Sequence, residues 1–173
     1  MKTRQLPPSF YRCSALQVAP DLLYCRLAVR DSSGKIKRLT ISETEAYVGE
    51  EDLACHASRG RTKRTEVMYQ EGGVFYVYLI YGMYYMLNVV TAVRDRPEAV
   101  LIRGAREVSG PGRLTRDLQL GGELNGRPVT QKSGVWIEEK ERPPKRIRKG
   151  PRVGVSYAGA WADKLYRFIG EDR

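Results

Sequence analysis

A carboxylate, an aromatic ring and the only histidine of the chain stand close together in the sequence, at Glu45, Tyr47 and His56. A carboxylate can deprotonate and orient a water molecule, and an aromatic ring can stack on a planar ligand. Each residue also has an ordinary structural explanation, because a strand glutamate is usually solvated and a single histidine usually completes a local hydrogen bond. The stretch therefore indicates Glu45 as a candidate general base. A purely structural role for these residues stays open.

A strongly basic stretch runs from Arg59 to Arg64 and also contains Arg61, Thr62 and Lys63. Positive charge gathered around a hydroxyl is suited to hold a phosphate group. A charged surface turn explains the same residues equally well, since basic runs are common and most of them bind nothing specific. The stretch is thus a candidate phosphate cradle.

Tyrosine is unusually frequent between residues 69 and 85. On alternating strand positions Tyr76 and Tyr78 would share one face, whereas Tyr81 stands beside Gly82 at the tip of a hairpin, where a ring has no core to enter. A rigid, flat side chain at such a tip is what minor-groove proteins insert between bases. The tyrosines that produce this pattern are Tyr69, Tyr76, Tyr78, Tyr81, Tyr84 and Tyr85.

Asn88 is a primary amide between Leu87 and Val89, in a stretch that has the composition of a strand. Burying this amide without a partner would cost about 1–3 kcal/mol. We therefore expect a defined partner for Asn88, which is either the backbone or the edge of a bound base.

The elements that must position these side chains are mainly strands. Leu22 to Val29 and Ile36 to Ser42 flank the turn sequence Asp31 to Gly34, which predicts a hairpin. Its second strand is expected to continue through Glu43 to Val48. Glu43, Glu45 and Tyr47 would then point to the same face of the sheet, because side chains alternate along a strand.

A second hairpin is predicted from Val74 to Thr91, with its turn at Tyr81 to Met83. Ala99 to Arg103 has the composition of a buried strand, and Pro111 to Leu120 has apolar residues at helical spacing. Short strands are expected at two further places, Val135 to Ile137 and Val153 to Val155.

Between those two short strands, Glu138 to Arg152 contains Pro143-Pro144 and seven lysines or arginines. Such a composition predicts an exposed loop. The loop is either a solvated linker or an auxiliary contact to phosphates, because a basic loop is soluble with or without DNA.

Composition limits the class of protein. A chain of 173 residues with 42% hydrophobic side chains can bury one sizeable core, so we expect one domain. The net charge of +10 favours a polyanionic partner such as nucleic acid. No apolar run approaches the roughly 20 residues of a spanning helix, and Met1 to Ser9 lacks the features of a secretory signal. We expect a cytoplasmic protein that makes no membrane contact.

The cysteines, Cys13, Cys25 and Cys55, are odd in number and irregular in spacing. They predict reduced thiols rather than a disulfide framework, and no metal site. A zinc deaminase, one class of enzyme that extrudes bases from nucleic acid, would need the motifs His-x-Glu and Cys-x-x-Cys. The chain has neither motif.

Several strings of residues follow one another along the chain: Glu43-Thr44-Glu45-Ala46-Tyr47, Cys55-His56-Ala57, Arg59-Gly60-Arg61-Thr62, Tyr76-Val77-Tyr78-Leu79-Ile80-Tyr81-Gly82-Met83, Leu87-Asn88-Val89-Val90 and Ala99-Val100-Leu101-Ile102-Arg103. In these strings and their order the chain resembles the alkyladenine (3-methyladenine) DNA glycosylase family. The resemblance extends from about Leu22 to Arg103, resumes at Gly110–Leu114 and Gly150–Gly154, and ends at Trp161 to Phe168. It implies one mixed α+β domain over residues 1–173, with a curved antiparallel sheet, short flanking helices and a β-hairpin that probes DNA.

The resemblance also implies a role for individual residues. Glu45 would be the general base that activates water, and a flipped base would lie between Tyr47, His56 and Tyr78. Tyr81 would fill the gap left in the DNA, and Asn88 would exclude guanine by crowding its exocyclic amine. The implied contacts to DNA phosphates are Arg103, Thr62, Arg61, Tyr76 and Met83.

The implied activity is that of a monofunctional DNA glycosylase without a cofactor. It would flip alkylated or deaminated purines, such as 3-methyladenine, 7-methylguanine, hypoxanthine and ethenoadenine, out of duplex DNA and hydrolyse the N-glycosidic bond, which starts base excision repair. Its partner would be double-stranded DNA containing damaged purines, and we expect a monomer. In a bacterium it would work at the nucleoid.

Two other functions fit parts of the sequence. A non-catalytic module that binds RNA or another single strand would use the same basic and aromatic face. A glycosylase with lyase activity would need a lysine or a terminal amine in the pocket.

The chain also departs from many family members at Lys63 and Thr65, and in the short link from Gly104 to Ser109. These departures bear on the contacts to DNA rather than on the pocket.

Overall fold

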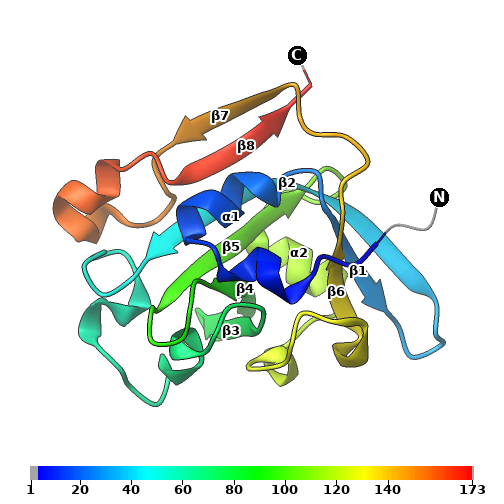
Figure 1. Cartoon of the computed structure of the whole chain (residues 1–173), viewed down its shortest axis with the longest axis horizontal. Coiled ribbons are helices and arrows are strands. Elements are labelled where there is room, and N and C mark those ends of the chain that lie inside the picture. The colour runs from blue at the N-terminus through cyan, green and yellow to red at the C-terminus, as the bar shows by residue number, and fades with distance from the viewer. Residues whose placement is uncertain (1–3, 173) are drawn as a thin grey trace.

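The longest strand, β2 (Ile36–Val48), organises the sheet (Figure 1). The computed structural model describes residues 4–172. The other strands are β1 (Arg26–Arg30), β3 (Phe75–Ile80), β4 (Tyr84–Thr91), β5 (Glu98–Ala105), β6 (Val135–Glu138), β7 (Arg146–Gly150) and β8 (Arg167–Glu171).

All pairs of neighbouring strands are antiparallel, in the order β3-β4-β5-β2-β1-β6. β1 pairs with β2 only as far as Thr40, and β8 occupies the same edge of β2 from Glu43 to Glu45. β7 extends the sheet beyond β8. Because β5 covers the opposite edge, Glu45 lies in a strand with hydrogen-bonded neighbours on both sides.

The main core lies between one face of the sheet and two helices, α1 (Ala15–Asp21) and α2 (Pro111–Asp117). α1 crosses β2 and β5 (Figure 1), and the Thr44 hydroxyl donates to the Ala19 carbonyl. Ser14 is the N-cap of α1 and forms a capping box with Gln17, which satisfies free amides at the start of the helix. Short 3₁₀ helices occupy Pro8–Arg12, His56–Arg59, Glu66–Tyr69, Gly122–Leu124, Gln131–Ser133 and Ser156–Asp163.

The predicted fold class is confirmed: the chain is an α+β protein with a curved antiparallel sheet and few short helices. Both predicted hairpins are present, β2 does continue to Val48, and β5, α2 and β6 occupy the expected stretches. The first hairpin begins at Arg26 rather than Leu22, because α1 ends just before and Tyr24, at φ +70°, turns the chain into the strand.

Two expectations for the C-terminal third were wrong. Val153 to Val155 is a turn rather than a strand, with Gly154 at φ +74°. The stretch from Glu138 to Arg152 is not simply an exposed loop, because it contains β7, and Arg152 is buried. The exposed, highly charged sequence of β7 suits an edge strand, and it lacks the apolar alternation that would have indicated one.

Candidate active site

One row of directly paired residues crosses the sheet and lines a cavity of about 360 Å³. The register pairs Tyr76 on β3 with Asn88 on β4, Asn88 with Leu101 on β5, and Leu101 with Glu45 on β2. Directly opposed residues point to the same face of a sheet. The register therefore brings together side chains that lie far apart in the sequence.

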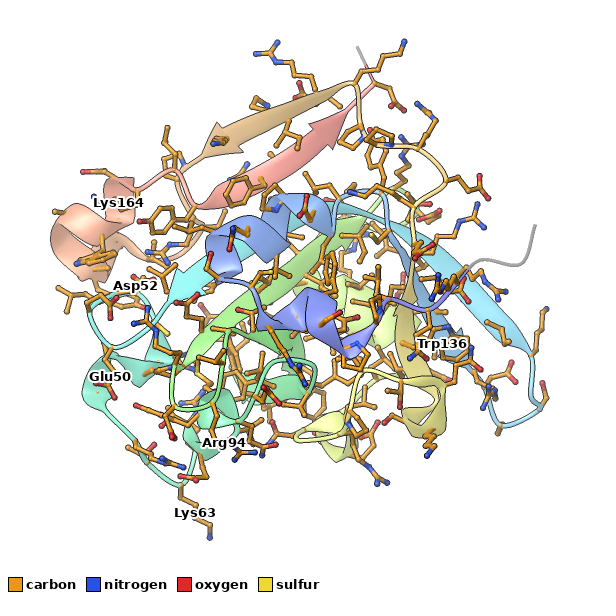
Figure 2. All side chains as sticks on the ribbon, in the orientation of Figure 1. Glu50, Asp52, Lys63, Arg94, Trp136 and Lys164 are labelled. Carbon is orange, nitrogen blue, oxygen red and sulfur yellow. The ribbon has the colours of Figure 1, made fainter. Side chains whose placement is uncertain are left out.

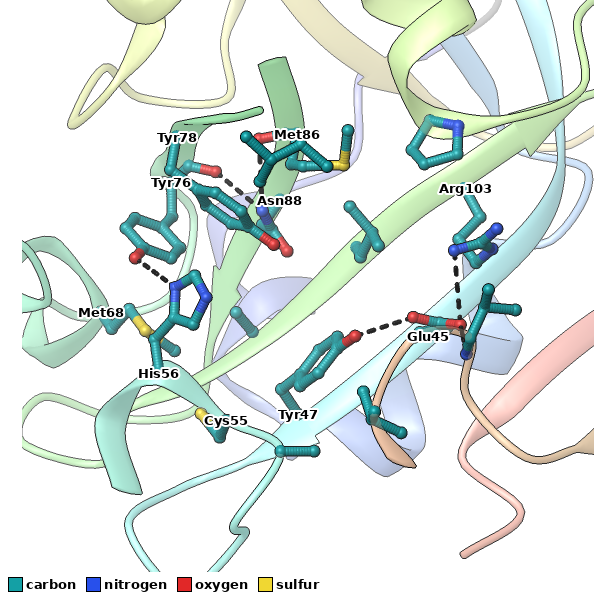
Figure 3. A pocket seen from close by; sticks show the side chains of 18 of the residues that line it. Glu45, Tyr47, Cys55, His56, Met68, Tyr76, Tyr78, Met86, Asn88 and Arg103 are labelled. Atoms are coloured by element: carbon teal, nitrogen blue, oxygen red, sulfur yellow. Dashed lines mark hydrogen bonds and ion pairs between the residues drawn. The ribbon is translucent and has the colours of Figure 1, made fainter. Parts of the chain in front are cut away.

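Residues two positions along these strands point the same way and complete the cavity. Tyr78, Tyr47 and Arg103 belong to this second set, and His56 approaches from its short helix. Figure 3 shows the aromatic and amide side chains around His56 on one side and the Glu45 and Arg103 pair on the other. The structure thus places all of the predicted base-binding residues and the predicted general base in one pocket.

Glu45 is completely buried and is held by three groups. The Tyr47 hydroxyl donates to Oε2 at 2.8 Å, the Val153 backbone N–H donates to Oε1 at 2.8 Å, and Arg103 Nη1 lies 3.6 Å from Oε1. Burial raises the pKa of Glu45, while Arg103, the Val153 amide and Tyr47 oppose the rise. Glu45 is consequently a fixed carboxylate that is more basic than an exposed glutamate.

Arg103 lies between two carboxylates. Its Nε is 3.1 Å from Glu43 Oε1, and its Nη1 faces Glu45. Only 17% of the side chain is exposed. In this position the guanidinium favours the ionised form of Glu45, and its predicted contact to a phosphate stays a prediction.

His56 forms an aromatic wall with two tyrosines. Its Nδ1 shares a hydrogen bond of 2.8 Å with the Tyr76 hydroxyl, and its ring centroid lies 4.5 Å from that of Tyr78. Burial, together with the nearby charges of Arg64 and Arg59, lowers the pKa of His56 to about 4. The ring is therefore neutral at physiological pH and offers a stacking surface rather than an acid.

Tyr47 rests on a buried ion pair that sequence reasoning missed. The guanidinium carbon of Arg152 lies 4.8 Å from the Tyr47 ring centroid, and both Arg152 and its partner Asp52 are fully buried. Arg152 also donates to the Ala46 carbonyl, and Asp52 accepts from the Val48 amide. Figure 2 places Asp52 where the segment after β2 meets the C-terminal part of the chain. Arg152 went unnoticed because it ends a stretch whose other basic residues, from Lys145 to Lys149, are exposed.

Asn88 has the backbone partner that was one of its two expected alternatives. Its Nδ2 donates to the Tyr76 carbonyl at 3.1 Å and to the Met86 carbonyl at 3.3 Å. Within residues 4–172 the amide oxygen accepts no hydrogen bond, and the side chain lines the cavity. The backbone contacts thus fix the orientation in which Asn88 meets whatever occupies the pocket.

The tip of the β3–β4 hairpin carries Tyr81 at the rim of the cavity. Tyr81 is 86% exposed, and the neighbouring Met83 projects from the same tip and is 64% exposed. Tyr81 and Gly82 have φ values of +52° and +66°, as a type I′ turn requires. A non-glycine residue pays about 1–2 kcal/mol for this left-handed conformation, so the exposed ring is held in place against a local cost.

The basic stretch folds as a loop in which Arg61, one of the predicted phosphate contacts, is paired with two carboxylates. Arg61 bonds Glu66 at 2.7 Å and Asp95 at 3.0 Å, and the Thr62 hydroxyl contacts that of Thr65. Tyr76, a further predicted phosphate contact, is buried in the pocket wall with its hydroxyl on His56. The phosphate contacts of Arg61, Thr62, Tyr76 and Met83 stay predictions.

Residues 4–172 contain neither a metal-binding cluster nor a membrane-spanning helix. No group of three or more His, Cys, Asp or Glu side chains in that range is arranged to hold a metal ion. Nor is any helix of the described chain long and apolar enough to cross a membrane. Cys13, Cys25 and Cys55 are free thiols, as predicted.

Known proteins match the chain over almost its whole length. A family model described as methylpurine-DNA glycosylase matches residues 9–110 and 105–173. A protein of Psychrobacter cryohalolentis named "Putative 3-methyladenine DNA glycosylase" is 42% identical over an alignment 194 residues long, gaps included. The alignment covers 95% of this chain and 91% of that protein. Proteins with the same name from Myxococcus xanthus (44% identical; 94% and 88% covered) and Legionella pneumophila strain Corby (42%; 98% and 96%) are similar to it as well. The chain belongs to the methylpurine-DNA glycosylase family and is a DNA repair hydrolase that acts on alkylated bases.

Proposed function

We propose that this glycosylase extrudes alkylated or deaminated purines from duplex DNA into the cavity beside Glu45 and hydrolyses their N-glycosidic bond. The observation that carries the proposal is a fully buried carboxylate facing an aromatic wall across one cavity. Burying a charge is costly even when it is paired, so folding alone would not favour a carboxylate at this position. A pocket with these two walls suits a planar base and its sugar.

Glu45 activates the attacking water in this proposal. The bond from C1′ of the sugar to the purine nitrogen breaks, the bonding electrons leave with the base, and C1′ acquires oxocarbenium character. The carboxylate stabilises that charge and accepts a proton from the water whose oxygen bonds to C1′. Arg103 and the Val153 amide keep the carboxylate ionised and oriented. The products are the free base and an abasic site.

The aromatic wall selects the base. Extrusion costs a few kcal/mol, less for a badly paired lesion, and stacking returns roughly 1–3 kcal/mol per base. A cationic purine such as 3-methyladenine or 7-methylguanine gains further from the electron-rich rings of Tyr47 and Tyr78. The neutral state of His56 adds no repulsion against that cation. Asn88 is proposed to exclude guanine by crowding its exocyclic amine.

Neutral lesions lack this advantage. Hypoxanthine and ethenoadenine are poor leaving groups unless a donor protonates or hydrogen-bonds them. With a pKa of about 4, His56 supplies no proton at neutral pH. We therefore expect these lesions to be released more slowly than 7-methylguanine.

Two observations bear on the alternatives. Among residues 4–172 no lysine lines the cavity, which favours hydrolysis over a lyase that forms a Schiff base. A module that only binds single strands has no use for a buried carboxylate, so Glu45 favours the enzyme. One chain supplies the whole pocket, so we propose that the protein works as a monomer. Because its proposed substrate is chromosomal DNA, we propose that it acts in the cytoplasm, at the nucleoid.

A panel of duplexes tests the proposal. Duplexes with a single 7-methylguanine, ethenoadenine or hypoxanthine, and an undamaged control, are incubated with excess protein, and abasic sites are scored after alkali. The proposal predicts release in the order 7-methylguanine before the neutral lesions, and none from the control. Absence of abasic sites in all three damaged duplexes would contradict it, and trapping of a protein–DNA adduct by borohydride would replace hydrolysis by the lyase alternative.

A further inference from the structure

Glu43 lies two residues before Glu45 on β2, and both side chains point to the same face of the sheet. Its Oε1 is 3.1 Å from the Nε of Arg103 on β5 and 3.1 Å from the Nε of Arg167 on β8. Arg103 in turn faces Glu45, with its Nη1 3.6 Å from Glu45 Oε1 (Figure 3). One guanidinium group is therefore shared by two carboxylates.

An irregularity in the strand pairing puts Arg103 in this position. Glu43 pairs with Gly104, whereas the next residue along β2, Thr44, pairs with Ile102. Arg103 is thus an extra residue of β5 at a bulge. Such bulges re-aim a side chain and are frequent next to active sites. The backbone therefore places Arg103 between the partners of two β2 residues rather than directly opposite Glu43.

The two carboxylates compete for Arg103. A guanidinium group that binds one carboxylate alone commonly forms two parallel N–H···O bonds of about 2.7–2.9 Å. The Nε of Arg103 donates a hydrogen bond to Glu43, while the 3.6 Å between its Nη1 and Glu45 is longer than such a bond. Arg103 is thus hydrogen-bonded to Glu43 and only electrostatically paired with Glu45. This arrangement leaves the Glu45 carboxylate with capacity to bond a water molecule.

The charge of Glu43 also acts on Glu45 directly. Burial raises the pKa of Glu45, Arg103 opposes the rise, and the charge of Glu43 adds to it. Glu43 therefore offsets part of the effect of Arg103. The other charged or titratable side chains around Glu45 are Tyr47 on β2, Tyr78 on β3, Arg152 before the turn at Val153, and Arg167 on β8.

We propose that Glu43 is a positioning residue for hydrolysis, which holds Arg103 back from Glu45 so that the Glu45 carboxylate can bond the attacking water. The inference deepens the proposed function and rests on it, because it requires Glu45 to accept a proton from that water. Without the charge of Glu43, Arg103 would close onto Glu45. A direct pair would make Glu45 less basic and would occupy the oxygen that the water needs.

The pH profile of base release tests the inference. Single-turnover rates on a duplex with 7-methylguanine are measured for the wild type, Glu43→Gln and Glu43→Asp. Glu43→Gln should lower the midpoint of the acidic limb by about 1 pH unit and the plateau rate by roughly 10-fold. Glu43→Asp keeps the charge and should keep the midpoint. Glu71→Gln removes an exposed carboxylate and is the matched control, which should keep both values.

A double-mutant cycle with Arg103→Met separates action through Arg103 from a direct effect of charge. If Glu43 acts through Arg103, Glu43→Gln should shift the midpoint much less in the Arg103→Met background than in the wild type. Circular dichroism melts verify that each variant is folded. Should Glu43→Gln fail to fold, Arg167→Gln gives a prediction of the opposite sign. Glu43 would then be held by Arg103 alone and draw it away from Glu45, so the midpoint should rise.

The outcomes are distinguishable from a failure of the proposed function. An unchanged or raised midpoint in Glu43→Gln, whatever its rate or Tm, would show that Glu43 only ties the strands together, which overturns the inference. Equal shifts in both backgrounds of the cycle overturn it too, because Glu43 would then act without Arg103. So does a midpoint that falls in Arg167→Gln. If the wild type releases no damaged base, or Glu45→Gln releases it equally fast, it is the proposed function that fails.

Discussion

Glu45 carries a charge at a position where folding by itself favours an apolar residue. It sits in a strand paired on both sides, and its immediate neighbour Ala46 belongs to the main core. The cost of burying the charge is offset by the Tyr47 hydroxyl, the Val153 amide and Arg103. Such local conflicts between stability and chemistry are typical of active sites.

The pH dependence of base release should follow Glu45. The carboxylate acts in its ionised form, and burial raises its pKa, so the rate should rise with pH through a midpoint above the ordinary value of 4.5. Single-turnover rates on 7-methylguanine between pH 5 and pH 9 measure this limb. A rate that instead falls as pH rises toward neutrality would show that the essential group must be protonated.

Removal of the Glu45 charge should stabilise the fold. A carboxyl whose pKa is raised in the folded state binds more protons there than in the unfolded chain, so its ionisation lowers stability as pH rises through that range. Glu45→Gln at pH 7 should increase the free energy of unfolding by on the order of 1 kcal/mol, or roughly 2–4 °C in Tm. The exposed Glu71→Gln should change little. A lower Tm for Glu45→Gln would mean that the hydrogen bonds of Glu45 outweigh its desolvation.

The candidate site residues could be named from the sequence because each carries its own chemistry. Glu45, Tyr47, His56, Tyr78 and Asn88 do meet in one pocket, as the resemblance implied. Partners supplied by the backbone could not be named in the same way. The amide that holds Glu45 comes from Val153, an apolar residue in a stretch that was expected to be a strand.

Two elements border the site, the β3–β4 hairpin and the turn at Val153. The β3–β4 hairpin presents Tyr81, and the turn at Val153 brings the C-terminal segment against β2. Behind that segment, the ion pair of Arg152 and Asp52 ties it to β2 and to the stretch that leads to His56.

Tyr81→Gly separates the wedge role of Tyr81 from any structural role. Glycine adopts the positive φ of this position without strain. The free energy of unfolding of the variant should therefore equal that of the wild type or exceed it by up to about 1–2 kcal/mol. Extrusion should weaken, because nothing then fills the gap in the base stack. The fluorescence of a base analogue at the lesion site measures extrusion, and a wild-type signal from a folded Tyr81→Gly would refute the wedge.

Asp52→Asn should destabilise the protein severely. Removing one partner of a fully buried ion pair leaves the other charge uncompensated, which typically costs about 3–5 kcal/mol. Glu71→Gln, which breaks an exposed pair with Arg12, should cost less than about 1 kcal/mol. Urea denaturation compares the two variants. A similar loss in both would show that the buried pair adds nothing beyond a surface contact.

Elements were predictable where local patterns are strong. Both hairpins have clear turn sequences and alternating strands, so their extents were close to those observed. β7 was missed because its sequence is mostly basic, and what makes it a strand is its pairing with β8. α1 was missed because it spans only Ala15–Asp21 and contains Pro20, which a helix interior rarely tolerates.

At the scale of the whole molecule, the positive charge and the pocket have successive roles in the proposed function. In the proposed function, a net charge of +10 would draw the protein to DNA whatever the base sequence, and the pocket would then discriminate among bases. The composition predicted this affinity for a polyanion. It could not show that β8 would take the edge of β2 next to Glu45, because that pairing joins residues more than a hundred positions apart.

The most direct test of the account compares wild type and Glu45→Gln on one duplex that carries a single ethenoadenine, with abasic sites scored after alkali. The wild type should convert the duplex to an alkali-labile product. Glu45→Gln should bind it with similar affinity and release the base about 10²–10⁴-fold more slowly. Release by Glu45→Gln at the rate of the wild type would contradict the central claim that Glu45 activates the water.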